Sequence, residues 1–523
     1  MGGAGRESKH LRKEIPLEDE RKKGSGASPW NWLSWIGAAL ILLGFVSGLF
    51  FLLLEILLDQ AAPYAGILYL LFTTLIATGF LLIPVGVLVR GRHPVSRGTA
   101  ETSGGYRVDL SKPAHRYAAL SFLATGMVVL LLIGIGTYKS YHATESTAFC
   151  GQLCHSVMHP EWTTYHNSSH ARVKCVECHI GSGAGWYARS KLSGLRQVYA
   201  VTVNSFPRPI PTPIRDLRPA RETCEECHWR RKFVGYKESV RSYFLGDEKN
   251  SLHRVRMLIK IGGEKTSFMR GSGIHYHMLI ASQVEYIASD AKRQEISWVR
   301  VTRADGSVTE YNSAEYPLTE PETEAMEIRT MDCMDCHNRP SHQFPPPMET
   351  VNHALEDGAI SSDLPFIKVQ AVKALDTEYA TTKEAVVGIA NRIRGFYRKR
   401  YPELLDQKPQ ELTRSIKEVQ RIYQRTIFPE MKASWSAYPD NLGHRDSPGC
   451  FRCHTDEMQS ADGETIFTDC NRCHLILAQG SSIDEVNVNF EEGLPFIHPD
   501  DDELLDEYTE CSDCHTGGKD VYD

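Results

Sequence analysis

Fourteen cysteines lie in seven pairs along the chain, and each pair is followed at once by a histidine. Six pairs have the spacing C-x-x-C-H, and the first, CGQLCH, has one more residue between its cysteines. This is the attachment pattern of c-type haem, in which two thiols bind the porphyrin and the adjacent imidazole reaches the iron. The sequence therefore predicts seven covalently attached haems, at Cys150/Cys154-His155, Cys175/Cys178-His179, Cys224/Cys227-His228, Cys333/Cys336-His337, Cys450/Cys453-His454, Cys470/Cys473-His474 and Cys511/Cys514-His515.

Structural zinc sites and disulfides also use closely spaced cysteine pairs, but neither requires a histidine directly after the second cysteine. Histidine occupies 21 of 523 positions. Seven such coincidences by chance have a probability of roughly 10⁻¹⁰. The pattern therefore excludes both readings, and it leaves no cysteine for a disulfide.

Each iron also needs a second axial ligand if it is to transfer electrons without binding substrate. Histidines outside the motifs are numerous enough to supply it for six or seven haems, although any one of them could be a plain surface residue. Met158, in CHSVM, is the candidate thioether ligand of the first iron, and a gap-filling methionine is its alternative role. The candidate ligands are Met158, His170, His277, His342, His353, His444 and His498.

Three apolar stretches occupy the first part of the chain, at about 33–58, 65–89 and 117–137. Each has 20 or more residues, which is about the length needed to cross a membrane as a helix. The first is too long for the apolar region of a cleaved signal peptide. We therefore expect three transmembrane helices.

Flanking charges predict how these helices are oriented. The first 30 residues carry seven Lys and Arg, and the loop after the second stretch carries six. The short loop 59–64 carries none. Because positive loops stay in the cytoplasm, the amino terminus is expected inside and everything after Lys139 outside, in the periplasm of a bacterium.

The spacing of the motifs divides the periplasmic part into segments. We expect the fold to be mainly α, and the haem-bearing segments to have little regular structure outside two insertions. The first insertion has the alternation of β-strands around 255–261, and a hairpin pattern at 296–311. If the segment IHYH is also a strand, His275 and His277 point to one face. The second insertion has helical spacing after a capping box at Thr381 and Glu384. The expected organisation is a basic cytoplasmic tail (1–32), a three-helix anchor (33–138), a domain with haems 1–3 (139–232), a β-rich insertion (233–325), the haem 4 segment (326–345), a helical insertion (346–440) and a domain with haems 5–7 and an acidic tail (441–523).

Charge is unevenly distributed along the chain. The net charge of −7 argues against nucleic-acid binding. From Glu491 to Asp523 there are twelve acidic residues and one basic residue, a net charge of −11. Such a tail is either a solvated surface or a docking surface for a lysine-rich cytochrome.

Residues 117–233 resemble the NapC/NirT family of membrane-anchored cytochromes that oxidise quinol. The resemblance is carried by an apolar anchor followed by FCGQLCHSVMHPEW, HARVKCVECHIG and CEECH. The tracts MDCMDCHNRPSH and GHRDSPGCFRCH extend it to a seven-haem, inner-membrane member of the family. The first motif departs from the family pattern by its extra residue, and Met158 stands three residues after His155 rather than two.

The resemblance implies oxidation of menaquinol at the haem nearest the membrane and delivery of electrons to periplasmic c-type cytochromes. It also implies that a methionine ligates the first iron in place of His155, and that a lysine with a nearby carboxylate binds the quinol. Lys191, in RSKLSGLRQVY, is the matching lysine, and a lipid-phosphate anchor is its alternative role. Glu55 is a second candidate for the quinol site, because carboxylates within membrane spans are costly and often functional; its alternative is a place at the headgroup level.

Two other function classes are compatible with the motifs. A terminal multihaem reductase would act on a small inorganic or metal acceptor at a haem with an open position. A structural or charge-storing haem protein would need no quinol residues. The oligomeric state does not follow from the sequence.

Overall fold

The fold is described from a computed structural model. It describes residues 32–58, 65–90, 110–153, 155–181, 183–214, 218–229, 232–262, 273–278, 282–466, 468–484, 486, 492–499, 511–519 and 522. The chain separates into an amino-terminal unit, Met1–Thr144, and a carboxy-terminal unit, Glu145–Asp523.

The amino-terminal unit contains three long helices, α1 (Trp32–Leu58), α2 (Ala65–Arg90) and α3 (Pro113–Thr144). Helices α1 and α2 pack closely where two glycines face each other: a Cβ on Gly37 would lie 2.6 Å from the carbonyl oxygen of Gly79. Contacts between small residues of this kind are typical of helices that pack in a membrane. In the same way, a Cβ on Gly136 of α3 would lie 2.8 Å from the Thr73 methyl group of α2.

Two helices among the described residues are long and apolar enough to cross a membrane, over Trp32–Leu54 and Leu68–Gly86. Their large apolar side chains, such as Leu42 and Leu81, are mostly exposed, unlike those of a buried core helix. The third predicted span forms a helix as expected but is not among these two, so the count of three spans is not confirmed. The basic tail 1–32 and the loop around 91–109 lie almost wholly outside the described residues.

The carboxy-terminal unit begins with short helices that carry the first three motifs. They are α4 (Thr147–Gln152), α5 (His155–His166), α6 (Cys175–His179), α7 (Ala184–Thr202), α8 (Ala220–Thr223) and the 3-10 helix η1 (Cys224–Glu226). Ser146 caps α4 by accepting a hydrogen bond from the amide of Phe149.

Two antiparallel sheets follow, so the β-rich insertion is confirmed as β structure. One has the order β1-β2-β8, with β1 (Gly235–Phe244), β2 (Leu252–Gly262) and β8 (His474–Gly480). The other has the order β6-β3-β4-β5-β7, with β3 (Ser282–Ala288), β4 (Ile296–Arg303), β5 (Val308–Ser313), β6 (Arg329–Thr330) and β7 (Met458–Ser460). Strands β4 and β5 form the predicted hairpin. Thr302 pairs with Val308, so the turn lies between these two residues. Strands β7 and β8 come from the last haem segments, so the insertion is built into the rest of the unit.

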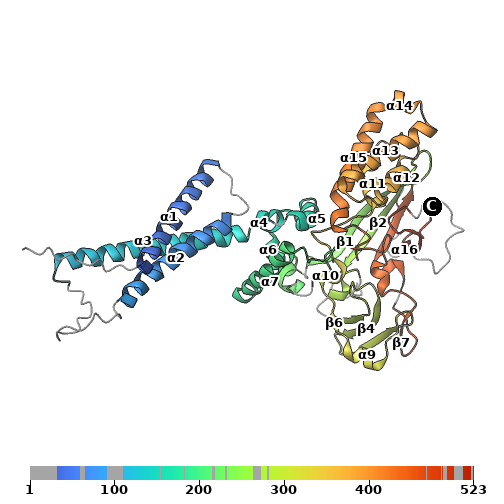
Figure 1. The fold of residues 1–523 in the computed structure, drawn as a ribbon. Coiled ribbons are helices and arrows are strands. Elements are labelled where there is room, and N and C mark those ends of the chain that lie inside the picture. The colour runs from blue at the N-terminus through green and yellow to red at the C-terminus, as the bar shows by residue number, and fades with distance from the viewer. Residues whose placement is uncertain are drawn as a thin grey trace, which may run out of the picture. The chain divides into compact units, whose positions relative to one another are not determined.

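The helical insertion is also confirmed. It contains α11 (Pro347–Glu356), α12 (Ile367–Leu375), α13 (Thr382–Arg400), α14 (Leu404–Gln407) and α15 (Pro409–Thr426). These helices gather at one end of the carboxy-terminal unit, while the five-stranded sheet lies at the other end and strands β1 and β2 run between them (Figure 1). Thr381 caps α13 by accepting from the amide of Glu384.

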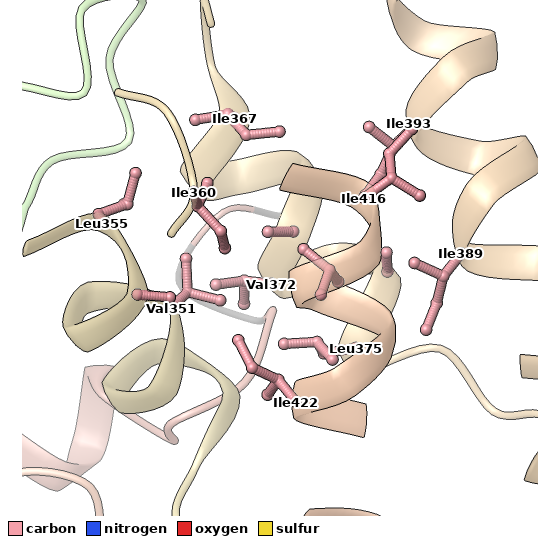
Figure 2. Packing of buried hydrophobic residues seen from close by; sticks show 14 of the residues in the cluster. Val351, Leu355, Ile360, Ile367, Val372, Leu375, Ile389, Ile393, Ile416 and Ile422 are labelled. Carbon is pink, nitrogen blue, oxygen red and sulfur yellow. The ribbon is translucent and has the colours of Figure 1, made fainter. Parts of the chain in front are cut away.

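A hydrophobic core fills the helical insertion (Figure 2). The buried side chains of α11, α12, α13 and α15 converge there, among them Val351, Val372, Ile389, Ile393 and Ile416. Val387, which has helical spacing with this face, is instead 57% exposed on α13. The unit therefore has more regular structure than we expected, because the helices of the insertion pack around a hydrophobic core to which Phe244 of β1 also contributes.

We expect Ile393→Ala to destabilise the helical insertion by about 2–5 kcal/mol, because the side chain is fully buried and its removal leaves a cavity. Val387→Ala, on the same helix but exposed, is the matched control and should change stability by less than about 0.5 kcal/mol. Urea unfolding followed by far-ultraviolet circular dichroism measures both. Equal effects of the two substitutions would contradict this packing.

Candidate functional site

The second to seventh motifs fold as single tight turns that place the cysteines and the histidine together. The amide of His228 donates to the carbonyl of Cys224, and that of His337 to the carbonyl of Cys333, each at 2.8 Å. His515 makes the same 2.8 Å bond to Cys511. Four residues of helical turn bring the first cysteine and the histidine to the same side, which is why the motif needs this spacing. These turns are η1, α10 (Cys333–Cys336), η5 (Gly449–Arg452), η6 (Cys470–Arg472), α16 (Cys511–Cys514) and, in the second motif, α6.

The cysteines of these turns differ in exposure, and Cys227 of the third motif is the clearest case. Its amide donates to the carbonyl of Cys224 at 3.2 Å, so both cysteines belong to one turn, yet Cys224 is half-buried while Cys227 and His228 are exposed. An exposed position differs from the enclosed surroundings usual for a residue that holds a cofactor. In this motif the first cysteine packs against the chain and the second lies at the surface, where a porphyrin can reach it. Haem attachment at Cys227 therefore stays a prediction. The other exposed cysteines are Cys178, Cys450, Cys470 and Cys514.

Among the motif histidines whose side chains the structure describes, six face a second histidine. The ring centroids of the two imidazoles are between 5.8 and 6.3 Å apart. The pairs are His179–His342, His228–His170, His337–His275, His454–His277, His474–His444 and His515–His498.

This separation fits one iron between two imidazoles. A ligating nitrogen lies about 2 Å from its metal and about 1 Å from its own ring centre, so two imidazoles on opposite sides of one iron have centroids about 6 Å apart. The distance is too long for direct contact between the rings. The residues present therefore fit haem iron with both axial positions filled.

Four of the second histidines are held by hydrogen bonds from Nδ1. The Nδ1 atoms of His170, His342 and His275 each lie 3.0 Å from a backbone carbonyl, those of Pro340, Glu161 and Ile261 respectively. His277 Nδ1 lies 3.2 Å from the carbonyl of Ile274. A histidine that donates through Nδ1 keeps the lone pair of Nε2 for a metal, and this bond fixes the orientation of the ring.

Burial favours the neutral form of five of the paired imidazoles. It lowers the pKa of His277 and His342 to about 4. It also lowers the pKa of His179, His275 and His337. Only the neutral ring can ligate a metal, so the environment already favours the ligating form at neutral pH.

The structure brings five of the predicted distal histidines next to a motif histidine: His170, His277, His342, His444 and His498. His353 lies exposed on α11, away from this arrangement. The histidine that sequence reasoning did not select is His275, which faces His337. IHYH is not a strand but ends in the 3-10 helix η3 (Tyr276–Met278), so His275 and His277 face two different motifs rather than one side.

The structure describes the first motif only in part. Cys154 and the side chain of His155 lie outside the described part of the chain, and Met158 is half-buried on α5. The thiol of Cys150 forms a hydrogen bond with that of Cys175, and this bond and burial raise the pKa of Cys150. Lys191 and Glu145 are close enough to Cys150 to act on its charge.

Lys191 and Glu145 form an ion pair beside this motif. The distance from Lys191 Nζ to Glu145 Oε1 is 3.2 Å, and Lys191 Nζ also lies 4.6 Å from the ring centre of Tyr187. The Lys191 side chain is 36% exposed and that of Glu145 only 14%. Sequence analysis found Lys191 but missed Glu145, which follows directly after the third apolar stretch. Glu55 lies in α1, and its side chain is outside the described part of the chain.

Comparison with known proteins identifies the class to which this arrangement belongs. Residues 112–209 match the model of the NapC/NirT cytochrome c family, N-terminal region. The fold, the motif turns and this match define a membrane-anchored multihaem c-type cytochrome, whose haem is covalently bound, and the chain belongs to the NapC/NirT family.

Within that family the chain is 40% identical to the cytochrome c-type protein ImcH of Geobacter sulfurreducens over 491 residues, which is 93% of this chain and 95% of ImcH. It is 26% identical to the cytochrome c-type protein NrfH of Wolinella succinogenes over 26% of this chain and 81% of NrfH. It is 29% identical to the tetraheme c-type cytochrome CymA of Shewanella oneidensis over 18% of this chain and 54% of CymA. No solved structure matches the chain.

Proposed function

We propose that this protein oxidises menaquinol at the periplasmic face of the bacterial cytoplasmic membrane and delivers the electrons to periplasmic c-type cytochromes. The observation that carries the proposal is the Lys191–Glu145 ion pair beside Cys150 of the first motif. Quinol oxidation needs one group that binds a quinol oxygen and another that accepts a proton from it. The half-exposed Lys191 and the nearly buried Glu145 are suited to these two roles, and both lie next to a haem attachment site. The relatives in the NapC/NirT family support the same reading.

Seven haems are proposed to be held by the fourteen cysteines. Six histidine pairs would fill both axial positions of haems 2–7, and Met158 would ligate the first iron as a thioether. Each haem iron can take up one electron and release it again. Irons with two protein ligands have no open position, so the histidine pairs favour electron transfer over reduction of a small substrate.

At the quinol site the chain has to remove two protons while two electrons leave. Quinol becomes quinone, and each electron reduces one ferric iron. Lys191 Nζ would donate a hydrogen bond to a quinol oxygen and so orient the ring. Glu145, released from part of its pairing with Lys191, would accept a proton. Glu55 remains a predicted second acceptor.

Helix α7 supports a position of this site at the membrane surface. It exposes an apolar stripe, Leu192, Leu195 and Tyr199, at helical spacing around the position of Lys191. A helix with exposed apolar side chains and basic neighbours is typical of the membrane–water interface, where a lipid-soluble quinol arrives. With three membrane spans and a cytoplasmic amino terminus, helix α7 would lie on the periplasmic side of the membrane.

The acidic tail from Glu491 to Asp523 is proposed as the docking surface for a basic, soluble cytochrome; most of it lies outside the described residues. Raising the ionic strength from about 0.01 M to about 0.15 M shortens the Debye length from about 30 Å to about 8 Å. Electron delivery to a lysine-rich cytochrome should then slow about ten-fold. An acidic cytochrome of similar potential is the control and should not slow. The same salt response for both acceptors would contradict docking on this tail.

The test of the proposed function uses the full chain in lipid nanodiscs. A pyridine haemochrome assay should count seven haems per chain, and a menaquinol analogue should reduce them and sustain reduction of a soluble cytochrome. Carbon monoxide should bind no haem beyond the first. A terminal reductase would instead show an open iron among haems 2–7, and a charge-storing protein would not be reduced by quinol at all.

A further inference from the structure

Successive motifs lie next to each other in space along the whole carboxy-terminal unit. We infer that the seven haem sites form one row in the order of their motifs along the chain, with the segment Gly273–Met278 joining the fourth site to the fifth. This rests on the haem sites proposed above, and goes beyond them by fixing which sites are neighbours.

The first three sites are joined through the turn that follows the fourth motif. Helices α4 and α6, which carry Cys150 and Cys175, are in contact, and the two thiols share a hydrogen bond. His342 faces His179 of the second site. Two residues before it, the carbonyl of Pro340 lies 3.0 Å from Nδ1 of His170, the partner of the third site. Sites 1, 2 and 3 are therefore consecutive neighbours.

The third and fourth sites meet between α8 and α10. These two helices are in contact, and the side chains of Cys224 and Cys333 lie within hydrogen-bonding distance of each other. His228 and His337 are also close enough to influence each other. The attachment cysteines of sites 3 and 4 thus lie side by side.

The fourth and fifth sites are joined twice. Arg452, inside the fifth motif, donates from Nη2 to the carbonyl of Asp335, inside the fourth motif, at 2.8 Å. His275 faces His337 and His277 faces His454. Because only Tyr276 separates the two ligands, one tight turn ties two irons together.

The fifth and sixth sites share a stacked ring. His444, the partner of His474, stacks on Phe451 inside the fifth motif, with centroids 4.4 Å apart and planes at 23°. The amide of Cys450 also donates to the carbonyl of Gly443 at 2.9 Å. The distal ligand of site 6 is therefore fixed against the attachment turn of site 5.

The seventh site lies at the end of the row, next to the sixth. Gly517 lies two residues after His515, and Asp446 lies two residues after His444. A Cβ on Gly517 would be 3.5 Å from Cβ of Asp446 and 2.6 Å from Cβ of Pro346. Site 7 therefore lies between the loop that carries the sixth distal ligand and the start of the helical insertion.

The order of the sites predicts which irons are magnetically coupled to one another. An interior site has two neighbours and the last site has one. In each transfer along the row one ferrous iron is oxidised and the next ferric iron is reduced, with no atom exchanged. An electron that enters at the first site reaches the seventh by passing the sites between them.

The test makes one chosen iron the first to be reduced. Methionine in place of an axial histidine raises the potential of a haem, so His275→Met marks site 4 and His498→Met marks site 7. One electron per protein is added from dithionite, and the low-spin ferric signals that remain are recorded by electron paramagnetic resonance. Loss of the spin at site 4 should change the signals of two other irons, and loss at site 7 should change one.

His277→Met is the second interior variant and should again change two signals, even if His275→Met fails to assemble. A haemochrome count of seven confirms assembly of each variant. A change at two or more irons from site 7, or at any number other than two from an interior site, overturns the row. Because no quinol is present, this result is independent of the quinol site.

Discussion

Replacing Lys191 by glutamine should slow quinol-driven reduction of the haems by about 100-fold or more, while dithionite still reduces them fully. The side chain is the half-exposed member of the ion pair with Glu145, 3.2 Å away and beside Cys150. Its loss removes the hydrogen-bond donor that would orient the quinol and the ion-pair partner that holds Glu145 in place. Positioned acid–base groups of this kind contribute about 10²–10⁴-fold to a rate.

Two further variants sharpen this prediction. Glu145→Gln should also slow quinol oxidation, because the amide keeps the shape of the carboxylate but accepts no proton. Arg196→Gln removes an exposed cation from the same helix α7 without touching Glu145, and should leave the rate within about two-fold. If Lys191→Gln and Arg196→Gln behave alike, Lys191 is only a surface anchor to lipid phosphate.

Asp335→Ala should destabilise the carboxy-terminal unit by about 3–5 kcal/mol, the largest effect on stability that we expect. This carboxylate lies inside the fourth motif and is almost fully buried. Its Oδ1 accepts hydrogen bonds from Tyr286 and Arg329, both at 2.7 Å, and its Oδ2 accepts from the amide of Asp332. The substitution would leave Arg329 without its main partner and free the five-stranded sheet from the haem 4 turn.

The matched control is Glu310→Ala on the same sheet. Glu310 lies 3.9 Å from Arg300, and its side chain is half exposed, so its loss should cost less than about 1 kcal/mol. Urea unfolding followed by circular dichroism compares the two variants. Similar midpoints would show that Asp335 is not a structural link between the sheet and the motif.

The sequence predicted what depends on local spacing. The C-x-x-C-H turns, the β4–β5 hairpin and the capped start of α13 follow from residues within a few positions of one another. The order of the motifs along the chain was also visible at once.

Contacts between distant segments could not be predicted in this way. His342 faces His179 only because the turn after the fourth motif folds back onto α5. Likewise, Glu145 becomes the partner of Lys191 only when α7 folds back beside the residues that precede α4. His275 was not selected because its partner, His337, is distant in the sequence. A strand at IHYH would place both histidines on one face, whereas next to the 3-10 helix η3 they face two different motifs.

The most direct test of the central claim is stopped-flow reduction of the wild-type protein in nanodiscs by a menaquinol analogue. Quinol oxidation beside the first haem predicts rapid reduction, with two electrons taken up and two protons released for each quinol, and loss of this phase in Lys191→Gln. The account is contradicted if quinol leaves the haems oxidised while dithionite reduces them, or if the Lys191 variant is reduced as fast as the wild type.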